Sequence, residues 1–298
     1  MKLATTIGDF RGYSSCAQEA VQYVCEAGFK YIDYGFGKDY KNRIGFFGDD
    51  FDGHVTSLKI QADKLGTKFV QAHAITGDVF AEDNTELISD TIRCIDACGA
   101  LGIENVVVHS GLGAGIEKEE NFEKNKVFYT PLLERAEKYG INILTENFNK
   151  GSVGSYRIDN APDLRELIDY IDHPLFHAVW DTGHGNLQEM PQDEALRILG
   201  EHVRAVHVQD NYGDRDIHIA PFFGSMSLDS LMHGLLDIGY NGYFTFEAVR
   251  MLFPAKQKRE YSDDKRLKKT PLRLRITAER FLYEIGKCIL EEYGCFEE

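Results

Sequence analysis

The chain has 298 residues, of which 43% are hydrophobic and 27% are charged, proportions typical of a soluble globular protein with a sizeable core. Its net charge is −15, from 48 acidic and 33 basic residues, and this mean field disfavours nucleic acid and anionic membrane surfaces as partners. No window approaches the roughly 18 apolar residues of a membrane span, no signal peptide precedes the first strand pattern, and the six cysteines form no C-x-x-C pair, so we expect a cytoplasmic protein with reduced thiols.

Apolar, strand-like segments alternate with helical patterns along the whole chain. The predicted strands cover residues 3–8, 31–34, 69–73, 105–109 and 141–146, a run that ends at Asp181, and then residues 204–208 and 243–247. One predicted helix begins at about Ala17, and the next one ends near Gly66 after a polar loop expected over 35–52. Further helices are predicted over 84–101, 119–139, 163–170 and 227–238, with a short one after Pro191. Eight such alternations, spaced by roughly 30 to 40 residues, predict an α/β fold of one (β/α)8 TIM barrel, with residues 1–298 as one domain.

A charge-rich insert at residues 254–271 separates the last predicted strand from the closing C-terminal helix. Its basic residues are interrupted by Glu260, Asp263 and Asp264, which favours a solvated loop or a subunit contact over a nucleic-acid-binding arm. Barrels of this kind are commonly oligomeric, so by analogy we also expect a homo-oligomer.

Four adjacent predicted strands end in side chains that can bind a metal ion: Glu146, Asp181, His207 and Glu247. In a TIM barrel the active site lies at the carboxyl ends of the strands, so these side chains are expected to converge. Burying three unpaired carboxylates together costs several kcal/mol each unless a cation compensates their charge. Three carboxylates and one imidazole form a mostly oxygen site, which predicts one divalent metal: manganese, magnesium, cobalt or zinc.

The motifs around these residues are similar to those of a known superfamily. Thr145-Glu146-Asn147, Trp180 to His184, His207 to Asp210 and Phe246-Glu247 resemble the xylose isomerase-like barrels, a superfamily of sugar isomerases and epimerases, and the resemblance covers nearly the whole chain. It implies that Glu146, Asp181, His207 and Glu247 bind the metal and that Glu146 and Glu247 also exchange a proton with the substrate. The expected function is therefore a metal-dependent isomerase or epimerase of a small carbohydrate, acting through a metal-stabilised enediolate.

Further side chains are expected to bind the substrate. The resemblance implies that His184 donates a hydrogen bond to a sugar oxygen, while His73 and His109, at two other strand ends, and the aromatic ring of Trp180 are expected to line the pocket. Several related epimerases have a glutamate and an arginine where this chain has Ser152 and Gly213, so Arg215 is expected to replace that arginine.

Two alternatives involve the same residues. The superfamily includes endonuclease IV, a three-zinc enzyme that acts on DNA, and its additional metal ligands have counterparts in His73, His109, His184, Asp216 and His218. The acidic loops after the first three predicted strands make this alternative the weaker one, because a DNA-binding surface needs lysine and arginine. The other alternative is a lyase resembling inosose dehydratase, in which the enediolate expels a hydroxyl group instead of being reprotonated.

Overall fold

The computed structural model describes residues 1–149, 155–156, 158–248, 250 and 270–298. Ser152 and nearly all of the predicted insert at 254–271 lie outside these residues. Over the described ranges, no helix combines the length and the apolar character that crossing a bilayer requires.

In the part of the chain that the structure describes, eight parallel strands close into a barrel. They are β1 (Lys2–Thr6), β2 (Tyr31–Gly35), β3 (Lys68–His73), β4 (Asn105–Val107), β6 (Asn142–Glu146), β8 (Phe176–Asp181), β9 (Val203–Val208) and β10 (Tyr243–Phe246). Each strand pairs with the next one along the chain, and β10 pairs with β1 to complete the circle. This closed order confirms the predicted (β/α)8 barrel, and all eight predicted strands are present.

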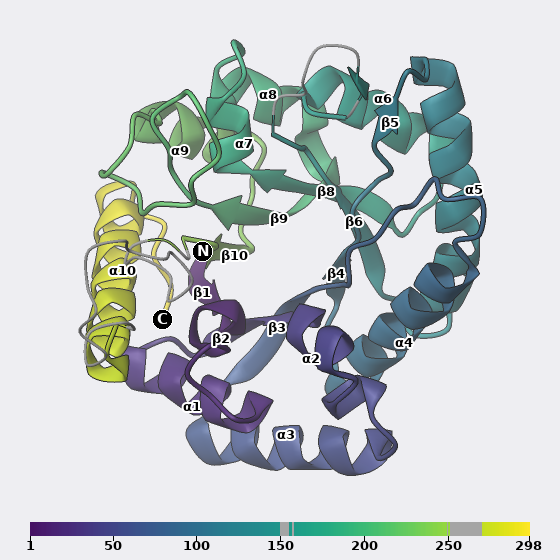
Figure 1. Ribbon diagram of the computed structural model, residues 1–298. Helices are drawn as coiled ribbons and strands as arrows, with labels where there is room; N and C mark the ends of the chain where they lie inside the picture. The colour runs from purple at the N-terminus through teal and green to yellow at the C-terminus, as the bar shows by residue number, and fades with distance from the viewer. Residues whose placement is uncertain (150–154, 157, 249, 251–269) are drawn as a thin grey trace, which may run out of the picture.

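Helices surround the barrel on its outside, as Figure 1 shows in a view along the barrel. The outer ring consists of α1 (Ala17–Ala27), α3 (Phe51–Leu65), α4 (Thr85–Leu101), α5 (Lys118–Glu137), α6 (Ala161–Ile171), α8 (Gln192–Leu199), α9 (Leu228–Asp237) and α10 (Leu272–Glu292). Gly66 and Gly102 end α3 and α4 in the left-handed conformation, with φ of 64° and 74°, which is why glycine marked the predicted helix ends.

Two hydrophobic layers result from the alternation of side chains along each strand. Val107, Leu144, Val179 and Ala205 form a small buried cluster inside the barrel. The neighbouring residues on the same strands point outward, where they pack against the helices in one large core that includes Val106, Ile143 and Val206. Polar side chains at inward-facing positions beyond this cluster therefore point into the barrel at the carboxyl ends of the strands.

Several short elements are absent from the sequence-based prediction. Helix α2 (Gly37–Asn42) and the 3-10 turn η2 (Gly45–Phe47) occupy the expected polar loop, and the fully buried Phe36 and Phe46 anchor that segment. The two-residue strands β5 (Gly113–Ala114) and β7 (Ser155–Tyr156) pair in an antiparallel ribbon. The two termini of the chain lie side by side, because the backbone N–H of Glu297 donates to the carbonyl of Met1 at 2.8 Å.

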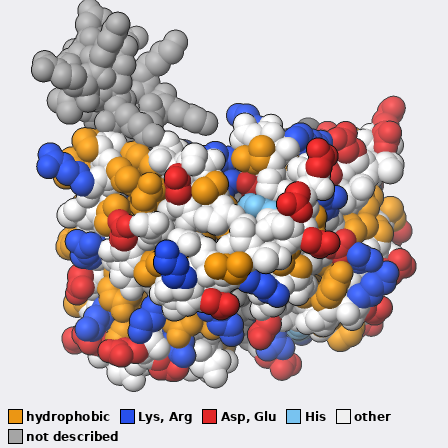
Figure 2. Space-filling view, turned by 90° about the horizontal axis from the view of Figure 1, so that it is seen from below, with side chains coloured by type: hydrophobic (Ala, Val, Ile, Leu, Met, Phe, Trp, Pro, Cys, Tyr) orange, Lys and Arg blue, Asp and Glu red, His pale blue; other side chains and the backbone are white. Residues whose placement is uncertain are grey.

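The surface carries both signs of charge. Figure 2 shows one face of the molecule, on which lysine and arginine side chains are interspersed with aspartate and glutamate. The visible face has no continuous basic track.

Candidate active site

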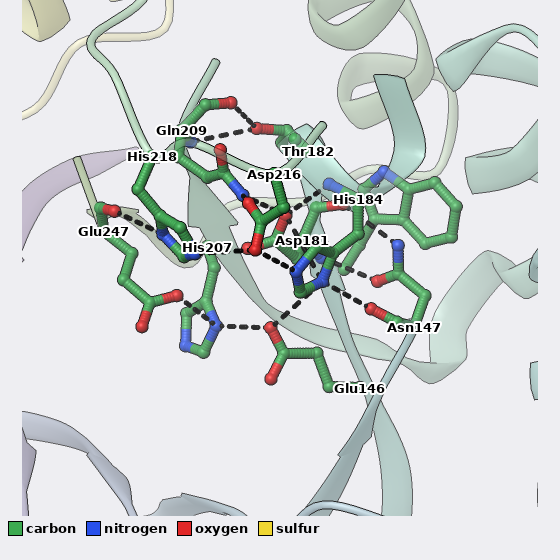
Figure 3. A network of polar contacts seen from close by, with 12 residues as sticks. Glu146, Asn147, Asp181, Thr182, His184, His207, Gln209, Asp216, His218 and Glu247 are labelled. Carbon is green, nitrogen blue, oxygen red and sulfur yellow. Dashed lines mark hydrogen bonds and ion pairs between the residues drawn. The ribbon is translucent and has the colours of Figure 1, made fainter. Parts of the chain in front are cut away.

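The four predicted metal ligands meet at one end of the barrel. Glu146 and Asp181 are the last residues of β6 and β8, His207 lies in β9, and Glu247 directly follows β10. Each side chain contributes one atom to a set whose members all lie within 4.8 Å of one another. Figure 3 shows the four side chains pointing toward a common centre.

Glu146 is the buried carboxylate that connects this set with its neighbours. Its Oε1 lies 3.0 Å from Nδ1 of His207, and its Oε2 lies 2.9 Å from Nε2 of His109. Burial alone would raise the pKa of Glu146, but the two imidazoles outweigh burial and hold the pKa well below its ordinary value. Glu146 is therefore an ionised acceptor with two imidazole partners.

Asp181 is fully buried, and only one of its two carboxylate oxygens has hydrogen-bond partners. Its Oδ1 accepts from the backbone N–H of His184 at 2.7 Å and from the side-chain amide of Gln209 at 3.0 Å. Its Oδ2 has no hydrogen-bond partner, and burial raises the pKa of Asp181 to about 6. An unpartnered carboxylate oxygen beside two further carboxylates fits a cation, because a cation would supply the missing positive charge.

His207 is the imidazole that lies between two carboxylates of this set. Its Nδ1 faces both Oε1 of Glu146 and, at 3.4 Å, Oε2 of Glu247. Burial lowers the pKa of His207, but the carboxylates of Glu146 and Glu247 outweigh it and raise the pKa to about 10. A divalent ion would replace this proton, since metal binding requires a neutral imidazole.

Three further groups of potential metal-binding side chains adjoin this set among the described residues: one consists of Asp33, His73 and His207 and shares His207 with the set, and the other two flank it. His73, His109 and Glu146 form one, in which the Nε2 atoms of the two histidines are 2.9 Å apart. His184, Asp216 and His218 form the other, in which Oδ2 of Asp216 lies 3.4 Å from Nε2 of His184 and 3.1 Å from Nε2 of His218. Although burial opposes it, the hydrogen bonds from these two histidines hold the pKa of Asp216 below its ordinary value.

The two histidines that flank Asp216 are oriented by backbone carbonyls. Nδ1 of His184 lies 2.7 Å from the carbonyl oxygen of Asn147, and Nδ1 of His218 lies 3.0 Å from that of Glu247. Each Nδ1–H therefore donates to a carbonyl, which turns the Nε2 atom of each ring toward Asp216. In the Asp216 group both histidines thus leave Nε2 free for a metal while Nδ1–H donates to a carbonyl, the arrangement that orients a metal-binding imidazole.

Two residues expected to contact the substrate lie outside the buried cluster. The side chain of Arg215 is 74% exposed and lies beside Asp214, 4.0 Å away, instead of joining the buried cluster. Trp180 is buried outside the barrel, where its indole N–H donates to Oε1 of Gln192 at 2.6 Å. The cause is the alternation along β8, which directs Trp180 away from the side that Asp181 occupies.

Buried residues that the sequence-based prediction missed complete the site. Asp33 and Gln71 are aligned neighbours on β2 and β3, and Gln71 contacts His207. Burial raises the pKa of Asp33 to about 7. Gln71 could have been found by its spacing, because it precedes His73 by two residues and so shares the inward face of β3.

A cavity of about 440 Å³ opens next to His109, and its walls include Asp78, Ser110, Leu112 and Phe148. The ring of Phe148 packs edge-on against His109, with centroids 5.1 Å apart. The buried cluster therefore adjoins a space of the size that small-molecule sites have.

Comparisons with known proteins agree with this geometry. A family model described as a xylose isomerase-like TIM barrel matches residues 21–269. Fructoselysine 3-epimerase of Escherichia coli O157:H7 is 31% identical over 120 residues, 40% of this chain and 43% of that protein. D-psicose 3-epimerase of Ruminiclostridium cellulolyticum is 26% identical over 137 residues, 46% of this chain and 44% of that protein. The chain thus spans less than half the length of these two curated relatives.

Solved structures match over a longer range. A D-tagatose 3-epimerase-like protein superposes with a TM-score of 0.72 at 19% identity, covering 99% of this chain and 100% of that chain. A D-psicose 3-epimerase solved with D-fructose gives a TM-score of 0.73 at 15% identity, covering 97% of this chain and 99% of that chain. At such identities the likeness shows the fold.

Proposed function

Because the chain belongs to the xylose isomerase-like TIM barrel family, we propose that it is a sugar epimerase or isomerase that moves a proton at the carbon next to a ketose carbonyl. The relatives with the names fructoselysine 3-epimerase and D-psicose 3-epimerase support a ketose as the substrate. The site supports the same chemistry, because it offers paired carboxylates at the open end of the barrel.

One observation carries the proposal: Glu146, Asp181, His207 and Glu247 bring one ligand atom each within 4.8 Å of the others. These four residues would hold a divalent metal ion, and the unpartnered Oδ2 of Asp181 is the oxygen that most needs it. When bound, such an ion polarises the sugar carbonyl and stabilises the negative charge that develops next to it.

The proposed proton transfer uses Glu146 and Glu247. Both carboxylates face Nδ1 of His207, at 3.0 and 3.4 Å, and so lie close enough together to act on one bound sugar. One carboxylate removes the proton beside the carbonyl, and the other returns a proton to the opposite face of the resulting enediolate. Burial lowers the pKa of His184, but the charge of Asp181 outweighs it and raises the pKa to about 10, so the ring carries a proton on Nε2 as well as the one that Nδ1 donates to Asn147. From Nε2, beside Oδ2 of Asp216, His184 would donate to a substrate oxygen.

Solvent exchange tests this proposal. With Mn²⁺ and D-fructose in D₂O, deuterium is expected at the carbon beside the carbonyl, and Glu146→Gln and Glu247→Gln are each expected to reduce the exchange rate at least about 100-fold. Glu104→Gln, on an exposed residue before β4, is the control and keeps the wild-type rate. Turnover without deuterium incorporation would exclude an enediolate, and full activity of Glu146→Gln would remove that residue from the mechanism.

A lyase shares the first step of this reaction. Loss of a β-hydroxyl from the same enediolate would yield a dehydrated product, which mass spectrometry distinguishes from an epimer of unchanged mass. Accumulation of the dehydrated product would favour the lyase.

The two flanking groups favour a second candidate, a three-metal phosphodiesterase. His73 with His109, and His184 with Asp216 and His218, would complete two more metal sites around Glu146 and the central set. The net charge of −15 and the interspersed charges in Figure 2 oppose a DNA substrate. Metal analysis of the purified protein separates the candidates: one ion per chain supports sugar chemistry, whereas three zinc ions with cleavage of abasic DNA support the phosphodiesterase.

A further inference from the structure

A second cavity lies on the outside of the barrel, at the surface shared by α4 and α5. Its volume is about 360 Å³, and its described lining includes two basic, one acidic and two aromatic side chains, those of Arg93, Arg135, Asp96, Phe51 and Tyr139. Figure 1 shows both helices in the outer ring, away from the barrel interior in which the candidate metal ligands meet. A ligand of this cavity is therefore distinct from a sugar bound at the carboxyl ends of the strands.

The two guanidinium groups of the cavity are held in place and still have free donors. Nε and Nη2 of Arg93 donate to the carbonyls of Phe46 and Gly48, the second at 3.0 Å. Nε of Arg135 donates to Oδ1 of Asp96. Nη1 of Arg93 and both Nη atoms of Arg135 have no partner among the described residues, and they are accessible to solvent. These nitrogens can therefore donate to a ligand without first breaking a bond within the protein.

The lining of the cavity has an excess of positive charge. Its two guanidinium groups stand against one carboxylate, that of Asp96, and the other described lining residues are uncharged. In a chain with a net charge of −15, this is a local reversal of sign. Guanidinium groups with free N–H donors bind phosphate and carboxylate oxygens through charge-assisted hydrogen bonds. The cavity therefore favours an anion.

Aromatic rings stand next to both cations. Cζ of Arg93 lies 5.3 Å from the ring centre of Phe51, and Cζ of Arg135 lies 5.7 Å from that of Tyr139. The Tyr139 ring lies directly against Gly99 of α4, where a Cβ atom would approach the ring to 2.5 Å. Glycine destabilises the interior of a helix relative to alanine, and at this position it makes room for the ring. The cavity thus combines an anion-binding part with an apolar, aromatic part.

We propose that this cavity binds a small organic phosphate monoester, with the phosphate at Arg93 and Arg135 and the organic part against Phe51 and Tyr139. A phosphate has three oxygens that can accept from donors on two guanidinium groups, whereas a carboxylate has two. Inorganic phosphate binds more weakly, because it leaves the two rings uncovered. Asp96 holds Arg135 in place, but its charge repels the ligand and so limits the affinity.

Isothermal titration calorimetry of the full chain tests this proposal with three probes: phenyl phosphate, inorganic phosphate and benzoate. EDTA in the buffer keeps metal ions out of the barrel interior. Phenyl phosphate is expected to bind at one site per chain, at least about 5-fold more tightly than either other probe. Arg135→Gln should weaken its binding about 5- to 20-fold, since the substitution removes free donors and a positive charge. Arg165→Gln is the matched control, because Nε of Arg165 likewise pairs with an aspartate, Asp169, outside the cavity.

Two further variants give changes that misfolding would not produce. Asp96→Asn removes the repelling charge, so phenyl phosphate should bind about 3- to 10-fold more tightly. Tyr139→Ala should weaken phenyl phosphate about 3- to 10-fold and change the affinity for inorganic phosphate less than about 2-fold. The proposal is overturned by the absence of saturable phenyl phosphate binding, by equal affinity for benzoate or inorganic phosphate, by unchanged binding in Arg135→Gln, or by weaker binding in Asp96→Asn.

Discussion

The amide nitrogen of Gln71 lies 2.6 Å from Nε2 of His207, on the edge of the imidazole ring away from the nitrogen that faces Glu146 and Glu247. For His207 to bind a metal through Nδ1, its Nε2 must carry the proton, and the amide of Gln71 accepts that proton when its oxygen is turned toward the ring. Gln71 thus fixes both the tautomer and the orientation of the ring.

Gln71→Leu is therefore expected to weaken Mn²⁺ binding about 10- to 100-fold, because Nε2–H of His207 loses its acceptor. Gln71→Glu keeps an acceptor and should bind Mn²⁺ more tightly than Gln71→Leu. Isothermal titration calorimetry measures both affinities, with Gln22→Leu, a glutamine exposed on α1, as the control. Equal Mn²⁺ affinity of Gln71→Leu and the wild type would show that the contact does not position His207.

The central set was predictable from the sequence because each of its members stands at or near the end of an apolar run. Gln71 and Asp33 were missed because they lie inside their strands, and their meeting depends on the register that aligns Asp33 of β2 with Gln71 of β3. Arg215 lies outside the cluster, because spacing alone does not give the direction of a loop side chain. Trp180 lies behind the barrel wall against Gln192, a position that the two-residue period of a strand already separates from that of Asp181.

Metal binding should stabilise the folded protein, because the unfolded chain does not bring the four ligands together. At a metal concentration of 100 times Kd the expected gain is about 2.7 kcal/mol. Asp181→Asn keeps the oxygen that accepts from His184 but loses the negative charge at Oδ2, so most of this gain should disappear. Differential scanning fluorimetry with Mn²⁺ and with EDTA measures the effect, and Asp63→Asn, at an exposed position on α3, should respond like the wild type. A metal-induced shift of equal size in Asp181→Asn would contradict the assignment of Asp181 as a ligand.

Trp180→Phe tests the position of this residue behind the barrel wall. The substitution removes the indole N–H and leaves Oε1 of the buried Gln192 without its donor, so the free energy of unfolding should fall by about 1–3 kcal/mol. The KM for a ketose should stay at the wild-type value, because the ring does not reach the cluster. Urea denaturation and steady-state kinetics provide the two readouts. A severalfold rise in KM at unchanged stability would instead show that Trp180 contacts the substrate.

A second buried polar cluster joins the first strand to the last helix. Nη2 of Arg275 lies 2.6 Å from Oδ2 of Asp9, in the 3-10 turn η1 (Ile7–Phe10), and 3.7 Å from Oε2 of Glu279. The hydroxyl of Thr5 donates to Oε1 of Glu279 at 2.6 Å. Burial, followed by the charge of Asp9, raises the pKa of Glu279 well above its ordinary value of 4.5, so the folded protein holds a proton there.

This proton makes stability depend on pH with a defined sign. Between the unfolded pKa of Glu279 and its raised folded pKa, the folded state binds more protons than the unfolded state, so the stabilisation is complete below the unfolded pKa and is lost as pH rises through the folded pKa. Glu279→Gln mimics the protonated acid, so its free energy of unfolding should overtake that of the wild type by about 1.4 kcal/mol per pH unit within this window. Urea denaturation from pH 5 to alkaline pH measures both proteins, with the exposed Glu284→Gln on the same helix as the control. Parallel pH profiles for Glu279→Gln and the wild type would mean that Glu279 is already ionised in the fold, its charge balanced by Arg275.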